Sequence, residues 1–159
     1  MNELIVRSSV FENNSWMPDQ CSGYGENKSP DLKIDGIPKD AVTLAIIMDD
    51  LDHPVFREFN HWTAWNIPCV DMIPEAIPGG AVSEKPFHIE QGVGYGKHIY
   101  RGPKPPFNSK HRYRFQVFAL DTRLQLRSES RKKDLVTAMD GHVLATGELI
   151  GIYQRNHGL

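Results

Sequence analysis

The chain has 159 residues, of which 40% are hydrophobic and 24% are charged, and its formal net charge at pH 7 is −2. This length and composition predict one globular domain, residues 1–159, with a core of ordinary size. A weakly acidic chain lacks the basic face that binding to nucleic acid requires, so we exclude nucleic acid as a partner.

The N-terminus and the longest apolar run predict where the protein works. The first residues do not have the basic segment and long apolar run of a signal peptide. The longest apolar run, 42–48, is too short to span a bilayer, so we expect no stable membrane insertion and a cytoplasmic protein. Cys21 and Cys69 form no CxxC pair, and in a reducing compartment we expect free thiols, although a disulfide stays open.

The first two thirds of the chain predict a loop followed by strands. Turn-forming residues crowd 20–38, which indicates a long ordered loop. A strand is predicted at 42–48, apolar on both faces and therefore central in a sheet. Two more are predicted at 61–67 and at 111–120, the latter alternating and rich in aromatic residues. The stretch 73–108 is full of Pro and Gly and favours turns and short edge strands.

The last third of the chain has a composition that favours helices, unlike the first two thirds. Residues 133–139 have a helical composition, and Gly141 suits the position just after a helix. We interpret 143–153 as a second helix, although Gly147 and Gly151 weaken its helix propensity. Strands followed by helices favour a mainly β sandwich with terminal helices over alternating βαβ units.

Strand parity gathers polar side chains at one end of this sheet. Alternate side chains share a face, so the apolar row of the first strand continues into Asp50 and Asp52. The third strand carries His111 and Tyr113 at its N-terminal end, and the second begins with His61. If both run antiparallel to the first, the five side chains rim one pocket. Each alone is more commonly a capped or solvated turn residue, so it is their convergence that indicates a site.

Two motifs carry a resemblance to a known family. The sequence Asp-Leu-Asp-His-Pro at 50–54, followed by His61, is similar to the first motif of the phosphatidylethanolamine-binding protein family, also called the Raf kinase inhibitor protein family. The sequence Gly-Pro-Lys-Pro-Pro at 102–106, followed by His-Arg-Tyr at 111–113, is similar to its second motif. The resemblance is to the bacterial and archaeal branch and covers most of the chain.

The resemblance implies a mainly β fold of two antiparallel sheets with C-terminal α-helices, and a pocket for phosphate or another small anion. It implies no metal, no cofactor and no catalytic residue. The ligand-binding residues expected from the two motifs, the neighbouring loop and a C-terminal aromatic are Asp50, Asp52, Pro54, His61, Gly102, Pro103, His111, Tyr113 and Tyr153.

The chain departs from the family pattern at the predicted pocket. Leu51 and His53 stand where the family has Pro and Ala, and Lys104 stands where microbial members often have Cys. His53 adds an ionisable group and Lys104 a cation, so ligand preference and pH dependence are expected to differ. We expect His61 and His111 to donate N–H groups to the anion and Asp50 to orient a histidine.

The leading interpretation is a binding protein, not an enzyme, for phosphate or phosphorylated head groups. Regulation of a partner protein and formation of a homodimer stay open. The main alternative is a metal-dependent hydrolase, because Asp and His are ligands for zinc and manganese. Against it, the sequence has no HExxH motif or close pair of histidines. Nucleophilic catalysis by Ser109 beside His111 is a third option, but no GxSxG elbow is present.

Overall fold

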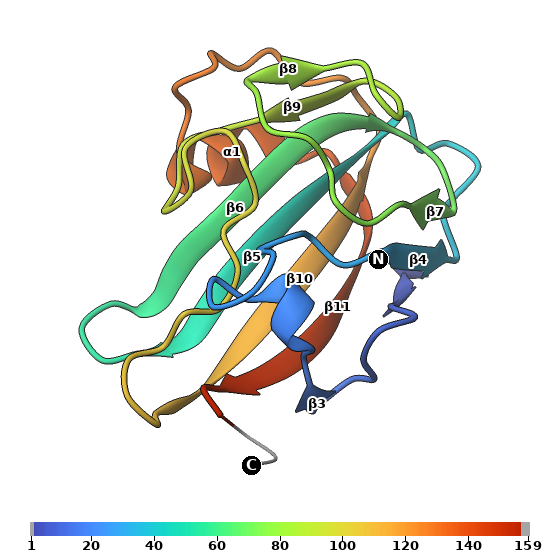
Figure 1. The fold of residues 1–159 in the computed structure, drawn as a ribbon. Helices are drawn as coiled ribbons and strands as arrows, with labels where there is room; N and C mark the ends of the chain where they lie inside the picture. The colour runs from blue at the N-terminus through green and yellow to red at the C-terminus, as the bar shows by residue number, and fades with distance from the viewer. Residues whose placement is uncertain (1, 157–159) are drawn as a thin grey trace.

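The computed structural model describes residues 2–156 and has β-strands as its main elements (Figure 1). In chain order they are β1 (Asn2–Glu3), β2 (Ile5–Arg7), β3 (Ser15–Trp16), the 3-10 helix η1 (Asp19–Cys21), β4 (Leu32–Asp35), β5 (Thr43–His53), β6 (Arg57–Pro68), β7 (Met72–Ile73), β8 (Val82–Ser83), β9 (Ile89–Gln91), β10 (Lys110–Leu120), α1 (Lys132–Met139) and β11 (Val143–Gln154).

The strands form two sheets, as expected. The larger has eight strands in the order β1-β11-β10-β5-β6-β9-β8, with β3 also paired to β11. The smaller has the order β2-β4-β7. Pairing is antiparallel except for β1 and β3, which both run parallel to β11. The fold is therefore mainly β.

The core lies on both faces of the large sheet. On one face, Leu4 and Ile34 beside the small sheet belong to one buried cluster with Ile46 and Phe115. On the other face, Ile47 and Trp65 pack with Leu135 and Met139 of α1. Strand β5 is thus covered on both sides, which explains its continuous apolar run.

The three predicted strands are confirmed, and the structure extends two of them. β5 continues to His53 and β6 already begins at Arg57, so a hairpin with a short tip projects from the end of the sheet (Figure 1). Both β6 and β10 run antiparallel to β5, which confirms the direction that the predicted pocket requires. In 73–108 the structure has only short strands and turns, also as predicted.

The predicted second helix is wrong, because 143–154 is the strand β11. β11 pairs with β10 along nearly its whole length. Its glycines are explained by packing: a Cβ at Gly147 would lie 2.2 Å from the carbonyl O of Leu4, and one at Gly151 would lie 2.3 Å from Cγ of Met17. The glycines let the N-terminal segment lie directly on β11.

The single C-terminal helix, α1, is placed as predicted. The Asp134 carboxylate accepts the backbone N–H of Arg131 at 2.9 Å, and Gly141 has a positive φ of 82° after the helix. The predicted loop 20–38 is interrupted by β4, which joins the small sheet. Both cysteines are free thiols, and burial raises the pKa of Cys21 to about 12. None of the helices within 2–156 is long and apolar enough to cross a membrane.

Candidate anion-binding site

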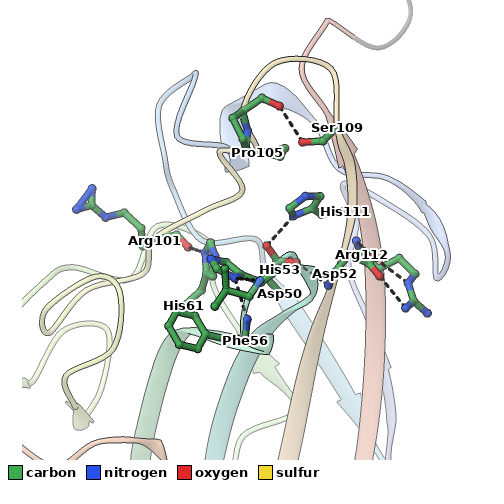
Figure 2. Close-up of polar contacts among 12 residues, drawn as sticks. Asp50, Asp52, His53, Phe56, His61, Arg101, Pro105, Ser109, His111 and Arg112 are labelled. Atoms are coloured by element: carbon green, nitrogen blue, oxygen red, sulfur yellow. Dashed lines mark hydrogen bonds and ion pairs between the residues drawn. The ribbon is translucent and has the colours of Figure 1, made fainter.

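A pocket of about 270 Å³ opens at the end of the large sheet, between the β5–β6 hairpin and the loop that precedes β10 (Figure 2). Its lining comes from β5, β6, β10 and two loops. The lining residues are Asp50, His53, Pro54, Phe59, His61, Tyr95, Lys104, Pro105, Pro106, His111 and Tyr113. The pocket therefore brings together four of the five groups that strand parity predicts.

A buried hydrogen-bonded pair, Asp50 and His111, forms one wall. Asp50 lies opposite Tyr113 in the β5–β10 register, and His111 stands two residues before Tyr113 on the same face. Nδ1 of His111 lies 2.7 Å from Oδ2 of Asp50, and the side chains are 9% and 5% exposed. The other Asp50 oxygen accepts the backbone N–H of Asp52 at 2.9 Å. Asp50 is held at both oxygens, so it orients His111 as predicted.

His61 forms the opposite wall and is oriented by a backbone carbonyl. Its Nδ1 donates to the carbonyl O of Arg101 at 2.7 Å (Figure 2). Its ring meets the rings of Tyr95 and Tyr113 edge-on, with centroids 5.1 and 5.4 Å apart. Burial lowers the pKa of His61 despite the opposing effect of Asp50. The ring is thus held neutral, with its proton on Nδ1.

This geometry corrects the expected role of the histidines. A carbonyl and a carboxylate can only accept, so Nδ1 carries the proton in both His61 and His111. In the neutral rings Nε2 is then an acceptor. Each histidine donates to an anion through Nε2 only after it is protonated. The sequence does not predict these tautomers, because they depend on what each Nδ1 touches.

Of the three departures from the family pattern, His53 and Lys104 line the pocket and Leu51 does not. Nδ1 of His53 accepts the backbone N–H groups of Val55 and Phe56, each at 3.2 Å. The proton of the neutral ring therefore lies on Nε2, so His53 is a donor without being charged. Lys104 is a lining residue, and its Nζ lies 5.7 Å from the centroid of the ring of Tyr24, which is outside the lining.

Tyr113 supplies a further neutral donor. Its side chain is buried, and this burial, with Asp50 nearby, raises the pKa of its hydroxyl well above the usual range. The hydroxyl therefore keeps its proton at all physiological pH values. Its ring stacks beside that of His111, with centroids 6.3 Å apart.

Several predicted residues support the pocket from outside its lining. Asp52 turns away at a register irregularity between Asp50 and His53. Both of its oxygens pair with Arg112, at 3.0 Å from Nε and 2.9 Å from the terminal nitrogen, and this pair lowers the pKa of Asp52. The Tyr153 hydroxyl donates to Asp19 at 2.7 Å and lies outside the lining.

Gly102 and Pro103 shape the loop and do not contact the pocket. The N–H of Gly102 donates to Oδ1 of Asn27 at 2.7 Å, so it is not a free donor for an anion. A Cβ at Gly102 would lie 2.0 Å from the carbonyl O of Cys21, which explains the glycine. The carbonyl of Pro103 accepts the N–H of Gly23 at 2.7 Å.

Four lining residues were missed: Phe59, Tyr95, Pro105 and Pro106. Phe59 stands two residues before His61, so strand parity could have found it. The two prolines lie within the second motif. Tyr95 comes from a glycine-rich loop, and only tertiary packing places its ring between His61 and Arg101.

A second buried charge lies on the opposite face of β5. The side chain of Asp49 is fully buried and pairs with Nζ of Lys132 at 2.6 Å and with Arg114 at 3.3 Å. Because Lys132 begins α1, this pair fixes the helix to the sheet. A larger groove of about 920 Å³ lies beside β1, β2 and β11, but it contains no histidine and none of the predicted residues. We therefore place the chemistry in the smaller pocket.

Comparison with known families identifies the family to which this chain belongs. Residues 7–154 match the family described as phosphatidylethanolamine-binding protein. The chain belongs to the phosphatidylethanolamine-binding protein family. Among relatives, it is 46% identical over 150 residues to a UPF0098 protein of Pyrococcus horikoshii, covering 93% of this chain and 75% of the relative.

Solved structures of the phosphatidylethanolamine-binding protein family share the fold. A homolog from Chlamydia trachomatis matches with a TM-score of 0.86 and 31% identity, over 98% of this chain and all of the other. E. coli YbcL, described as a member of the mammalian branch of the family, matches with a TM-score of 0.82 and 27% identity, over 95% and 98% of the two chains.

Proposed function

We propose that this protein binds a small oxyanion, such as phosphate or a phosphorylated head group, in the pocket between His61 and His111, and that it acts as a binding protein and not as an enzyme. The observation that carries the proposal is the buried Asp50–His111 pair, which faces His61 across a pocket that also contains Tyr113 and Lys104. Membership of the phosphatidylethanolamine-binding protein family supports it.

The charge balance of the pocket allows an anion despite Asp50. Both oxygens of that carboxylate already accept hydrogen bonds, so its charge is partly compensated by the protein. Lys104 supplies a positive charge at the wall, and His53 and Tyr113 supply donors that need no protonation. Protonation of His61 or His111 would add positive charge and a donor at Nε2. The pocket therefore offers an anion both charge and hydrogen bonds.

A binding role also agrees with the state of the nearest nucleophile. The Ser109 hydroxyl donates to the carbonyl O of Pro106 at 2.8 Å, and Ser109 is outside the pocket lining. It is therefore not hydrogen-bonded to His111, as a Ser-His-Asp arrangement requires. Within residues 2–156, no group of three or more His, Cys, Asp or Glu side chains is arranged to hold a metal ion.

A surface for a partner protein is a second part of the proposal. Phe56 at the hairpin tip and Phe107 in the opposite loop are 62% and 86% exposed, beside the two walls of the pocket. Exposed apolar side chains on both sides of a binding site favour a contact with another molecule. Ligand binding at this site would then alter the surface that the partner meets.

Titration calorimetry at pH 6 with phosphate and with phosphoethanolamine tests the pocket. We expect binding in the wild type and weaker binding in His111→Ala, because a hydrogen bond to a charged group contributes about 1.5–3 kcal/mol, or roughly 10- to 150-fold in affinity. His142→Ala is the matched control, because His142 also pairs with an aspartate, Asp121, but on the exposed surface. Equal affinity in His111→Ala and wild type would refute the site.

A further inference from the structure

Two of the three histidines that line the pocket, His61 and His111, present the same atom to a ligand. Nδ1 of His61 is occupied by the carbonyl O of Arg101, and Nδ1 of His111 by the carboxylate of Asp50, both at 2.7 Å. Neither partner can donate, so each neutral ring carries its proton on Nδ1 and a lone pair on Nε2. Because Nδ1 is engaged in both rings, Nε2 is the nitrogen that remains for a ligand.

Neutral histidines and a bare oxyanion do not fit each other. An oxyanion without a proton has only lone pairs on its oxygens, so its contact with a neutral Nε2 brings two acceptors together. A proton must lie between them. That proton can come from the ligand, if the ligand still has an O–H group, or from solvent, if the histidine becomes charged.

We propose that the pocket selects oxyanions that still carry an acidic O–H proton, such as hydrogen phosphate, over those that carry none, such as sulfate and phosphodiesters. This inference rests on the proposed anion pocket and deepens it. Hydrogen phosphate donates its own O–H to Nε2 of a neutral histidine. At the same Nε2 atom, sulfate or a diester needs one proton more from solvent.

The groups around each ring determine how easily the histidines become charged. Asp49 and Asp50 favour the charged form of His61, whereas burial and His53 disfavour it, and burial is the largest effect on its pKa. Tyr95 and Tyr113 meet the ring edge-on and are neutral. Burial therefore opposes the uptake of a proton from solvent by His61.

The surroundings of His111 differ from those of His61. Asp50 contacts its ring directly, and Asp52 lies close enough to interact with it electrostatically. Tyr113 stacks beside it, and Lys104 and His53 line the same pocket. No other lining side chain carries a charge.

The two sources of phosphate, a phospholipid head group and free phosphate, differ in whether they carry a P–OH group. An intact phospholipid head group is a diester and has no P–OH. Like sulfate, it therefore has no proton to donate to Nε2 of a neutral histidine. Hydrogen phosphate, and a phosphomonoester that keeps one proton, can donate a P–OH group to Nε2. The pocket should therefore bind hydrogen phosphate in preference to the head group of an intact phospholipid above neutral pH.

The number of protons taken up on binding distinguishes oxyanions that carry an O–H group from those that carry none. The three probes are inorganic phosphate, sulfate and glycerophosphoethanolamine as the diester. Their dissociation constants are measured by NMR chemical-shift titration at constant ionic strength, from pH 6 to pH 9. By linkage, the slope of log affinity against pH gives the number of protons taken up. Above pH 7.5 we expect sulfate and the diester to weaken by about tenfold per pH unit more than phosphate does.

Two further measurements test the role of each Nε2 atom. In the free wild type, imidazole 15N spectra should report the Nδ1–H tautomer for His61 and His111 and the Nε2–H tautomer for His53. His61→Gln or His111→Gln places an amide donor that does not titrate near Nε2, so sulfate binding should take up one proton fewer. His142→Gln, on the surface, should leave all slopes unchanged.

Equal slopes for phosphate and sulfate, or an Nε2–H tautomer in both pocket histidines of the free protein, would overturn this inference and leave the anion pocket intact. Absence of binding by all three probes at pH 6 would overturn the proposed function itself.

Discussion

The substitution Asp50→Asn isolates the influence of one carboxylate on the pocket. Oδ1 of Asp50 accepts the N–H of Asp52, so in the variant the amide oxygen must take this position. The amide nitrogen then faces Nδ1 of His111, at the place where Oδ2 now lies at 2.7 Å. Since the amide nitrogen donates, Nδ1 must accept, and the proton of the neutral His111 moves to Nε2. The variant should convert His111 into a permanent donor.

The structure also sets the expected effect on stability. Asp50→Asn keeps both hydrogen bonds but exchanges a charge-assisted one for a neutral one, which costs about 1 kcal/mol. Asp50→Ala leaves Nδ1 of His111 and the N–H of Asp52 unpaired in a site where the side chains of Asp50 and His111 are at most 9% exposed. Leaving two buried donors unpaired in this way costs about 1–3 kcal/mol for each.

Urea unfolding measures the effect of the substitutions on stability, and titration with sulfate at pH 8.5 measures their effect on anion binding. We expect Asn to be much milder than Ala in unfolding free energy, and Asp50→Asn to bind sulfate better relative to phosphate than the wild type does. Imidazole 15N spectra should show the change of tautomer in His111 alone. An unchanged tautomer in Asp50→Asn, with an unchanged ratio of sulfate to phosphate affinity, would refute the reasoning.

Three further predictions follow from the same geometry. Anion affinity should rise as pH falls through the titration of His61, whose pKa is lowered by burial. His53→Ala should lower the affinity about equally at every pH, because His53 donates while neutral; calorimetry from pH 5 to 8 checks both, and a loss confined to low pH would contradict the tautomer of His53. Elemental analysis of protein purified without chelator should find far less than one transition metal per chain, whereas stoichiometric zinc or manganese that disappears in His61→Ala would favour the hydrolase. Gly147→Ala should destabilise the fold by about 1–3 kcal/mol in urea, because its Cβ would meet the Leu4 carbonyl; wild-type stability would show that the N-terminal segment moves away freely.

The sequence predicted the pocket better than it predicted the end of the chain. Parity alone placed Asp50, His111 and Tyr113 on one face, because a strand leaves each side chain only two directions. Parity failed at Asp52, since the register irregularity before His53 turned it outward to Arg112. A local irregularity of this kind depends on the hairpin as a whole and leaves no separate signal in the sequence.

The error at 143–154 has a different physical cause. Helix propensity treats Gly147 and Gly151 as weak helix positions, but they are sites where another segment needs room. The segments that occupy this room, around Leu4 and Met17, are more than 130 residues away in sequence. The tautomer of His61 could not be predicted for the same reason, because the partner of its Nδ1 is a carbonyl 40 residues further along the chain.

The pairing of β1 and β3 with β11 has a consequence for the order in which the protein can assemble. On the ribosome, the residues of β1 and β3 are made long before those of β11, their partner strand. β10, next to β11 in the sheet, also exposes an unpaired edge until that last strand leaves the exit tunnel. Contacts between such distant segments slow folding, and open strand edges invite association between nascent chains. β1 and β3 must therefore remain without their partner strand until β11 has been made, whereas β2 can pair with β4 much earlier.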